Sequence, residues 1–111
     1  MGLTFAFEPN GSQGDFDFTV NGVSLGAVNI IQNQVSWFSG LQPECVKFSI
    51  KDENRLDEIL SALISFKDEN NYDDVIIGNY RGHVGTFFSE EVWNRHGFEL
   101  ADNPGYYRMK K

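Results

Sequence analysis

The sequence predicts an α+β (mixed α/β) fold, in which a twisted and mostly antiparallel sheet carries one longer and one short helix. Three observations lead to this expectation. Apolar and polar residues alternate through much of the first half of the chain, which is the pattern of half-buried strands. The apolar spacing becomes helical after Asn54, and a shorter helix is bounded by start and stop signals at Ser89 and Gly97.

The N-terminal part of the chain predicts three strands. Alternation over residues 3–7 indicates the first strand, and alternation over 16–20 indicates the second. Asn21-Gly22 is the strongest short hairpin signal that a sequence can carry, and it leads into a partner strand over 23–31. These last two strands should therefore pair as an antiparallel hairpin.

Further strands are predicted at 35–38, 45–50 and 75–77. The second of these would place alternating apolar side chains on one face, namely Val46, Phe48 and Ile50. The third is a short continuous apolar run, which is typical of a strand that is covered on both faces.

The longer helix is predicted at about 54–66. Its apolar residues recur at helical spacing and form one stripe, made of Leu56, Ile59, Leu60, Leu63 and Ile64. Asp52 or Asn54 can cap its start. We expect the helix to end near Phe66, because the segment that follows, KDENNYDD, is polar and acidic.

The C-terminal segment predicts a short helix at about 89–96, followed by two strands. Ser89 can act as the N-cap, and the acids in the first turn and the bases in the last turn suit the helix dipole. Gly97 is placed to leave the helix at positive φ. Asn-Pro-Gly at 103–105 predicts a turn, and 106–109 predicts a closing strand.

This C-terminal segment resembles the end of the GNAT superfamily of N-acetyltransferases. In that family a helix ends in a basic residue and a Gly-Phe pair, and the closing strand often ends in Tyr-Arg-Met. The matching residues here are Arg95, Gly97-Phe98 and Tyr107-Arg108-Met109. The hairpin also resembles the family's second and third strands, through Gly22, Leu25 and Gly26.

The resemblance implies roles for the elements in between. VKFSI (46–50) would be the fourth strand of the family, the helix at 56–66 would carry the phosphates of acetyl-CoA, and VIIGNY (75–80) would be the fifth strand. The match in element order covers about 16–111. It implies a single domain over 1–111 that lacks the first two helices of the family.

The segment that should bind the cofactor departs from the family pattern. There the fourth strand runs into Gln/Arg-x-x-Gly-x-Gly/Ala, whose glycines let the backbone approach a pyrophosphate at the helix N-terminus. This chain has no glycine over 51–58, and the helix start carries Asp52, Glu53, Asp57 and Glu58. These carboxylates would saturate the helix dipole and repel a pyrophosphate. We therefore expect no cofactor, and acetyl-CoA should not bind at useful strength.

The residues that would carry catalysis are also missing. The usual general acid of the family is a Tyr four residues before the Gly of the Gly-Phe pair, where this chain has Trp93. An Asn common earlier in that segment would fall at Thr86. His83 and His96 have no nearby cysteine and no metal-ligand spacing. The sequence therefore predicts no catalytic residue and no metal site.

Composition limits the class of partner. The chain has 111 residues, a formal net charge of −7 and one cysteine. The negative charge disfavours direct binding to nucleic acid and suits a protein that meets basic surfaces. No apolar run approaches the length needed to span a membrane, and a single cysteine leaves no internal disulfide, so we expect a cytoplasmic protein.

The favoured hypothesis is a non-catalytic, acetyltransferase-like protein that binds a protein partner with a basic surface. The residues expected to face this partner form two acidic clusters that flank the longer helix: Asp52, Glu53, Asp57 and Glu58, and Asp68, Glu69, Asp73 and Asp74. Charge reversal there should leave folding intact, because neither cluster lies on the apolar stripe. By analogy of size and charge, such domains are typical of virus-encoded inhibitors of host defence factors, including anti-CRISPR proteins.

Two other hypotheses stay open. A divergent acetyl-CoA-dependent N-acetyltransferase would bind the cofactor through backbone contacts between the fourth and fifth strands, with Tyr72, Tyr80 or His83 as the acid. A small structural or assembly subunit would pair its sheet edge with a copy of itself as a homodimer. If the acidic clusters bind nothing, the better candidates for an interface are the aromatic pairs: Trp37 and Phe38, and Phe87 and Phe88.

Overall fold

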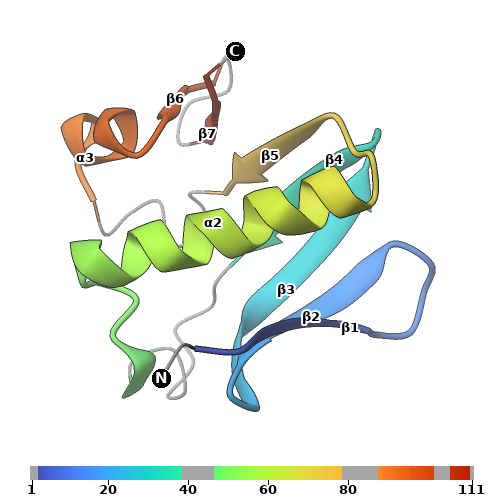
Figure 1. Cartoon of the computed structure of the whole chain (residues 1–111). Helices are drawn as coiled ribbons and strands as arrows, with labels where there is room; N and C mark the ends of the chain where they lie inside the picture. Colours follow the sequence, from blue (N-terminus) through green and yellow to red (C-terminus); the bar gives the residue numbers. More distant parts are fainter. Residues whose placement is uncertain (1–2, 39–46, 79–87, 102–105, 111) are drawn as a thin grey trace.

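The computed structural model describes four stretches of the chain, residues 3–38, 47–78, 88–101 and 106–110. In these residues the chain forms an α+β fold with a seven-stranded mixed sheet, one longer helix and one short helix (Figure 1). The strand order is β1-β2-β3-β4-β5-β7-β6. Neighbouring strands are antiparallel except β4 and β5, which are parallel. The predicted fold class is therefore confirmed.

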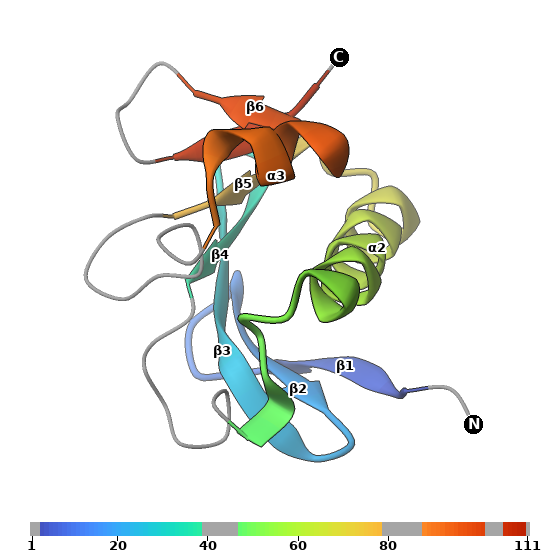
Figure 2. The same ribbon diagram turned by 90° about the vertical axis from the view of Figure 1, so that its left-hand side faces the viewer.

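The bounds of the elements follow the sequence pattern closely. The strands are β1 (Phe5–Pro9), β2 (Asp15–Val20), β3 (Val23–Ile31), β4 (Gln34–Phe38), β5 (Asp74–Ile77), β6 (Phe98–Leu100) and β7 (Tyr107–Met109). The helices are α2 (Glu53–Glu69) and α3 (Glu90–Arg95). The sheet curves around α2, so that β1 and β2 lie on one side of the helix and β6 and β7 on the other (Figure 2).

The β2–β3 hairpin forms where Asn21-Gly22 predicted it. Asn21 has φ 48° and Gly22 has φ 83°, the left-handed backbone conformation that both central residues of a type I′ turn adopt. The strand register shifts between Phe18 and Thr19, which marks an irregularity in the middle of β2. Turn and shift together set which side chains of the two strands face α2.

Asp52 caps the start of α2. Its Oδ1 accepts a hydrogen bond from the Asn54 amide at 3.0 Å, which satisfies one of the amide groups that a helix leaves free at its N-terminus. One of the two predicted caps is therefore confirmed.

The end of α2 lies beyond the predicted position, at Glu69 and not near Phe66. The Asn70 side chain donates a hydrogen bond to the Phe66 carbonyl at 2.9 Å, which supports an additional turn. Asn71 then leaves the helix with φ 58°. The polar segment therefore supplies the last turn of the helix before it becomes a loop.

The predicted strand at 45–50 is wrong over its described part. Residues 47–48 are helical, and 49–51 form a turn. Ser49 has φ 62°, a backbone conformation that an extended strand does not contain. Ile50 is nevertheless buried in the core, which explains the apolar alternation without a strand. The fourth strand of the sheet is β4.

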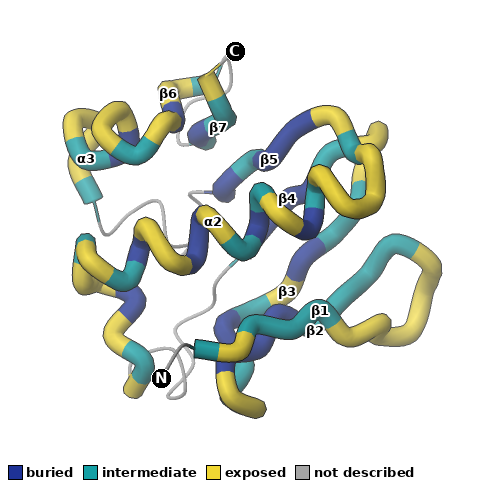
Figure 3. The backbone as a smooth tube through the Cα atoms, viewed as in Figure 1, coloured by how far each residue is buried: buried dark blue, intermediate teal, exposed yellow. Residues whose placement is uncertain are grey.

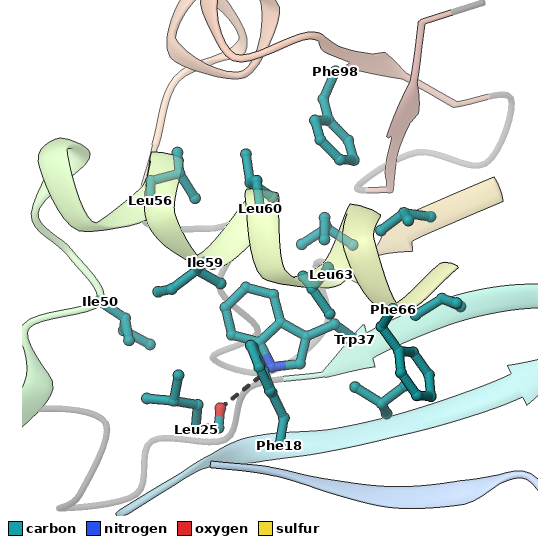
Figure 4. Close-up of a cluster of buried hydrophobic side chains, with 14 of the residues drawn as sticks. Phe18, Leu25, Trp37, Ile50, Leu56, Ile59, Leu60, Leu63, Phe66 and Phe98 are labelled. Atoms are coloured by element: carbon teal, nitrogen blue, oxygen red, sulfur yellow. Dashed lines mark hydrogen bonds between the residues drawn. The ribbon is translucent and has the colours of Figure 1, made fainter. Parts of the chain in front are cut away.

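The hydrophobic core fills the space between α2 and the sheet (Figures 3 and 4). The predicted helical stripe is buried at Leu56, Ile59, Leu60 and Leu63, whereas Ile64 is half-buried. Trp37 of β4 is fully buried at its centre. Its Nε1 donates a hydrogen bond to the Leu25 carbonyl at 3.3 Å, and the ring of Phe18 meets it edge-on with centroids 5.7 Å apart.

The C-terminal elements appear in the predicted order. Ser89 has the extended conformation of an N-cap, although its side chain makes no capping hydrogen bond, and Gly97 leaves α3 with φ 88°. β6 pairs with β7, and β7 pairs with β5. The turn predicted at 103–105 lies outside the described residues.

None of the helices in the described residues has both the length and the apolar character needed to cross a membrane.

Candidate partner-binding surface

The predicted partner-binding residues fall into two groups at opposite ends of α2. The N-terminal cluster consists of Asp52, Glu53, Asp57 and Glu58. The predicted C-terminal group is Asp68, Glu69, Asp73 and Asp74. Because Asp74 is buried, the C-terminal cluster consists of Asp68, Glu69 and Asp73 alone. Because α2 has 17 residues, the two ends are roughly 24 Å apart at a rise of about 1.5 Å per residue. The clusters therefore do not form one continuous surface.

The N-terminal cluster is bound by cations from α3. Arg95 holds Glu53 through both carboxylate oxygens, with its Nη2 2.9 Å from each and its Nε 3.2 Å from Oε2. Arg95 also reaches Glu91 of its own helix at 3.4 Å. At the other side of the cluster, Glu58 pairs with Arg55 at 3.3 Å. Cations of the same chain thus compensate most of the negative charge of the N-terminal cluster.

His96 completes the contact between α2 and α3. Its Nε2 lies 3.2 Å from Glu53 Oε2, and its Nδ1 lies 3.3 Å from Asp57 Oδ1. A carboxylate can only accept, so both contacts are hydrogen bonds when both ring nitrogens carry a proton, as in the imidazolium. The shallow hollow at this junction, about 370 Å³, is lined by the same groups. Its polar atoms are engaged with one another.

The pKa of Glu53 lies below its usual 4.5. The hydrogen bond from Arg95 is the largest cause, and the hydrogen bond from His96 acts in the same direction, while partial burial opposes them. The same contact raises the pKa of Arg95. The carboxylate of Glu53 is therefore stabilised in its charged form by the folded protein.

Replacing Arg95 with alanine should lower stability at neutral pH, and this loss should shrink in acid. Because the folded-state pKa of Glu53 is lowered from 4.5, the stabilisation is present above that value and is lost as the pH falls through the lowered one. Thermal midpoints of the parent and Arg95→Ala, measured from neutral pH to about pH 3, would test this. The matched control is Arg55→Ala, which breaks an exposed pair with Glu58 and a contact with the ring of Phe48 at 5.5 Å; the stability that it loses should change little with pH. A difference that stays constant with pH would contradict the expectation.

The C-terminal cluster has a different environment. Asp68 pairs with the adjacent Lys67 at 2.7 Å. Glu69 and Asp73 are exposed, and neither forms an ion pair with a Lys, Arg or His of the described residues. Within the described residues, these two carboxylates therefore present uncompensated negative charge to the solvent.

The expectation that Asp74 faces a partner is wrong, because this residue is only 2% exposed. Its Oδ1 accepts a hydrogen bond from the Val75 amide at 2.8 Å, and its Oδ2 lies 3.4 Å from Nη2 of Arg108. β5 pairs with β7, which explains how Arg108 comes near. For Asp74, burial argues against the expectation that charge reversal would spare folding. For Glu53 and Asp57, which are not buried, charge reversal would break their contacts with Arg95 and His96.

The aromatic pairs offered as alternatives do not form an exposed patch. Trp37 is in the core, and Phe38 is half-buried. Phe88 is half-buried against Trp93, with ring centroids 5.7 Å apart. Phe87 lies outside the described residues.

Trp93 occupies a core position. Its side chain is fully buried and stacks on Tyr107, with ring centroids 4.9 Å apart. Its Nε1 is buried without a hydrogen-bond partner among the described residues. The indole therefore acts as a packing group. Thr86, Tyr80 and His83 lie outside the described residues, and Tyr72 is half-buried.

No group of three or more His, Cys, Asp or Glu side chains in the described part of the chain could hold a metal ion. In comparisons with protein families, curated proteins and solved structures, nothing matched this chain.

Sequence reasoning missed the contact that Arg95 and His96 make with the N-terminal cluster. It assigned the two cations to the C-terminal dipole of the short helix. Glu53 and Asp57 are four positions apart and lie on one side of α2, which is the only signal that they could share a ligand. The pairing spans about 40 positions of the sequence, and no local pattern records it.

Proposed function

We propose that this protein is a non-catalytic, acidic domain with an acetyltransferase-like fold that acts by binding a protein with a basic surface. By analogy of its size and charge with those of viral inhibitors, the proposed role is that of a virus-encoded inhibitor of a host defence factor, similar to anti-CRISPR proteins. The single cysteine favours a cytoplasmic site of action.

The observation that carries this proposal is the state of Glu69 and Asp73. Both side chains are exposed at the C-terminal end of α2, and within the described residues no cation pairs with them. The chain as a whole has a net charge of −7. Such a field attracts a cationic surface, speeds its encounter and disfavours other acidic proteins.

The start of α2 supports the absence of a cofactor. The Asn54 amide, which could bind a phosphate, already donates to Asp52. Glu53 and Asp57 stand in the same turn, and their hydrogen bonds to α3 keep them in place. A pyrophosphate would have to displace these contacts and approach the carboxylates. Trp93 in the core offers no titratable group for catalysis.

A divergent acetyltransferase is the alternative, and one observation favours it. The resemblance puts acetyl-CoA between the strand predicted at 46–50 and the strand at 75–80. The described part of 46–50 is not a strand, but β4 runs parallel beside β5, and the alternative then places the cofactor between β4 and β5. The two strands nevertheless pair from Gln34 and Asp74 to Trp37 and Ile77, and the Gly78 amide then donates to the Trp37 carbonyl at 3.1 Å. Over these residues the two strands are hydrogen-bonded to each other and do not separate to admit a ligand.

Titration of the purified protein with acetyl-CoA in a calorimeter should give no saturating heat. The reason is the carboxylate-rich helix start together with the closed β4–β5 ladder. The matched comparison is Asp57→Asn with Glu58→Gln, which removes charge without adding bulk. Saturating binding by the parent protein, or acetyl transfer to any amine, would favour the enzyme.

A structural or assembly subunit is the third hypothesis, and it needs a free sheet edge. β1 and β6 are the two edges of the sheet in the described residues. Sizing chromatography at low and high salt separates this hypothesis from the first. A concentration-dependent dimer would favour it.

A further inference from the structure

Two surface hollows lie near the C-terminal end of α2, and ring contacts of the buried Phe66 link the residues that line them. The smaller, about 170 Å³, lies between β1 and α2 and is lined by Phe5, Phe7, Ala62, Ser65, Phe66 and Glu69. The larger, about 530 Å³, is lined by Gln13, Gly14, Phe16, Ile30 and Tyr72. We refer to the two hollows together as the aromatic groove.

Aromatic rings connect the two hollows. Phe7 stacks on Phe66 with centroids 4.0 Å apart, and Phe16 meets Phe66 edge-on at 5.2 Å. The ring of Tyr72 follows at 5.9 Å. Phe7, Phe16 and Tyr72 are all half-buried, so each ring keeps part of its surface open to solvent. Rigid aromatic side chains of this kind are the residues that most often anchor protein interfaces.

The acids of the C-terminal cluster border this groove. Glu69 lines the smaller hollow, one helical turn from Ser65. The side of this hollow that α2 forms, opposite β1, therefore carries an acidic side chain. Asp73 follows Tyr72, which lines the larger hollow, and the Asp73 amide is fixed by a hydrogen bond to the Asn33 carbonyl at 2.8 Å. Apolar surface therefore meets negative charge that no cation of the described residues pairs with, at this end of the molecule.

We propose that the aromatic groove binds a cationic, amphipathic segment of a partner protein. An apolar side chain of the segment enters the larger hollow beside Tyr72, and its Lys or Arg side chains meet Glu69 and Asp73. A second copy of this chain does not fit the same description, because it would bring its own net charge of −7 against these acids. The inference rests on the proposed function and specifies where and how that function is carried out.

The test uses a defined probe, a short fluorescent peptide in which Arg alternates with Leu. Fluorescence anisotropy should show binding to the parent protein at low salt. A peptide with Ser in place of each Leu should bind about tenfold more weakly, because it leaves the hollows unfilled. A peptide with Glu in place of each Arg should not bind.

Protein variants locate the binding on the surface. Tyr72→Ala should weaken binding of the Arg-Leu peptide by about tenfold, whereas Tyr72→Phe should keep it, because the ring is retained. Glu69→Lys with Asp73→Lys should weaken it by a similar factor at low salt. The matched controls on the far edge of the sheet are Leu100→Ser, whose side chain is 46% exposed, and Glu99→Lys. Both should bind like the parent, and circular dichroism should confirm that every variant is folded.

The outcomes separate this inference from the proposed function. Suppose that the Ser-for-Leu peptide binds as tightly as the Arg-Leu peptide, that Tyr72→Ala binds as tightly as the parent protein, and that the charge reversal still weakens binding. The groove is then not the anchor, and the electrostatic function stands. If the Leu100 control loses as much binding as Tyr72→Ala, the groove proposal is also wrong. Failure of the parent protein to bind the Arg-Leu peptide at all would overturn the proposal that the groove takes a cationic, amphipathic segment.

Discussion

Replacing Trp37 with alanine should lower the free energy of unfolding by about 3–5 kcal/mol. This side chain is fully buried in the core between the sheet and α2 (Figure 4), and truncation leaves a large cavity beside the ring of Phe18. It also leaves the Leu25 carbonyl without its hydrogen-bond donor. A small domain is stable by only about 5–15 kcal/mol in total, so the loss should be evident in urea unfolding at neutral pH.

Two variants serve as controls for the Trp37 experiment. Trp37→Phe keeps a ring but loses the hydrogen bond to Leu25, so it should lie between the parent and the alanine variant. Leu100→Ala removes an apolar side chain that is 46% exposed on β6, and it should change stability by no more than about 0.5 kcal/mol. If Trp37→Ala and Leu100→Ala lost similar stability, the core would not be organised as described.

Reversing the charge of Glu69 and Asp73 together should reduce the association rate of a basic partner by about tenfold or more at low salt. Both side chains are exposed and unpaired among the described residues, so the substitution removes attraction and adds repulsion without disturbing a contact. The measurement is surface plasmon resonance with a partner captured by the parent protein, then purified and immobilised. The thermal midpoint of the variant should stay close to that of the parent.

The matched control for this prediction is charge reversal in the N-terminal cluster. Asp57→Lys removes the contact with His96 and places a cation in the hollow that Arg95 also lines. Its main effect should therefore be a loss of stability, with a smaller effect on association. Glu99→Lys on β6 is the second control and should leave both quantities near the parent values. An Asp57→Lys variant that lost association without losing stability would show that the N-terminal cluster contacts the partner.

Local signals predicted much of the fold. Asn21-Gly22 fixed the hairpin because both residues tolerate positive φ, and the helical stripe gave α2 because its apolar spacing extends over several turns. Gly97 marked the end of α3 for the same conformational reason. Each of these signals acts between residues that are close in the sequence.

The errors come from contacts between residues that are distant in the sequence. The segment at 45–50 alternates like a strand, but Ile50 reaches the core from a turn. In the sequence, Asp74 looks like one more exposed acid of a polar segment. In the fold, β5 pairs with β7, which brings Arg108 beside Asp74 and buries its side chain. No local pattern distinguishes a carboxylate that will be buried by a partner strand from one that will face solvent.

The candidate surface was predicted in part. The sequence indicated acidic clusters at both ends of the long helix. Three of the four residues predicted at the C-terminal end are exposed, whereas Asp74 is buried. It could not indicate that Arg95 and His96 bind the N-terminal cluster, because α3 meets α2 only in the folded chain. The aromatic groove was also not predicted, since its rings come from β1, β2, α2 and the loop before β5.

The salt dependence of partner association tests the central claim most directly. The association rate of the parent protein with its purified basic partner should fall steadily as salt rises, because screening shortens the reach of Glu69 and Asp73. The rate of the Glu69→Lys, Asp73→Lys variant should be lower at low salt and should approach that of the parent at high salt. An association rate that is independent of salt and equal for the two proteins would contradict an electrostatic surface at the C-terminal end of α2.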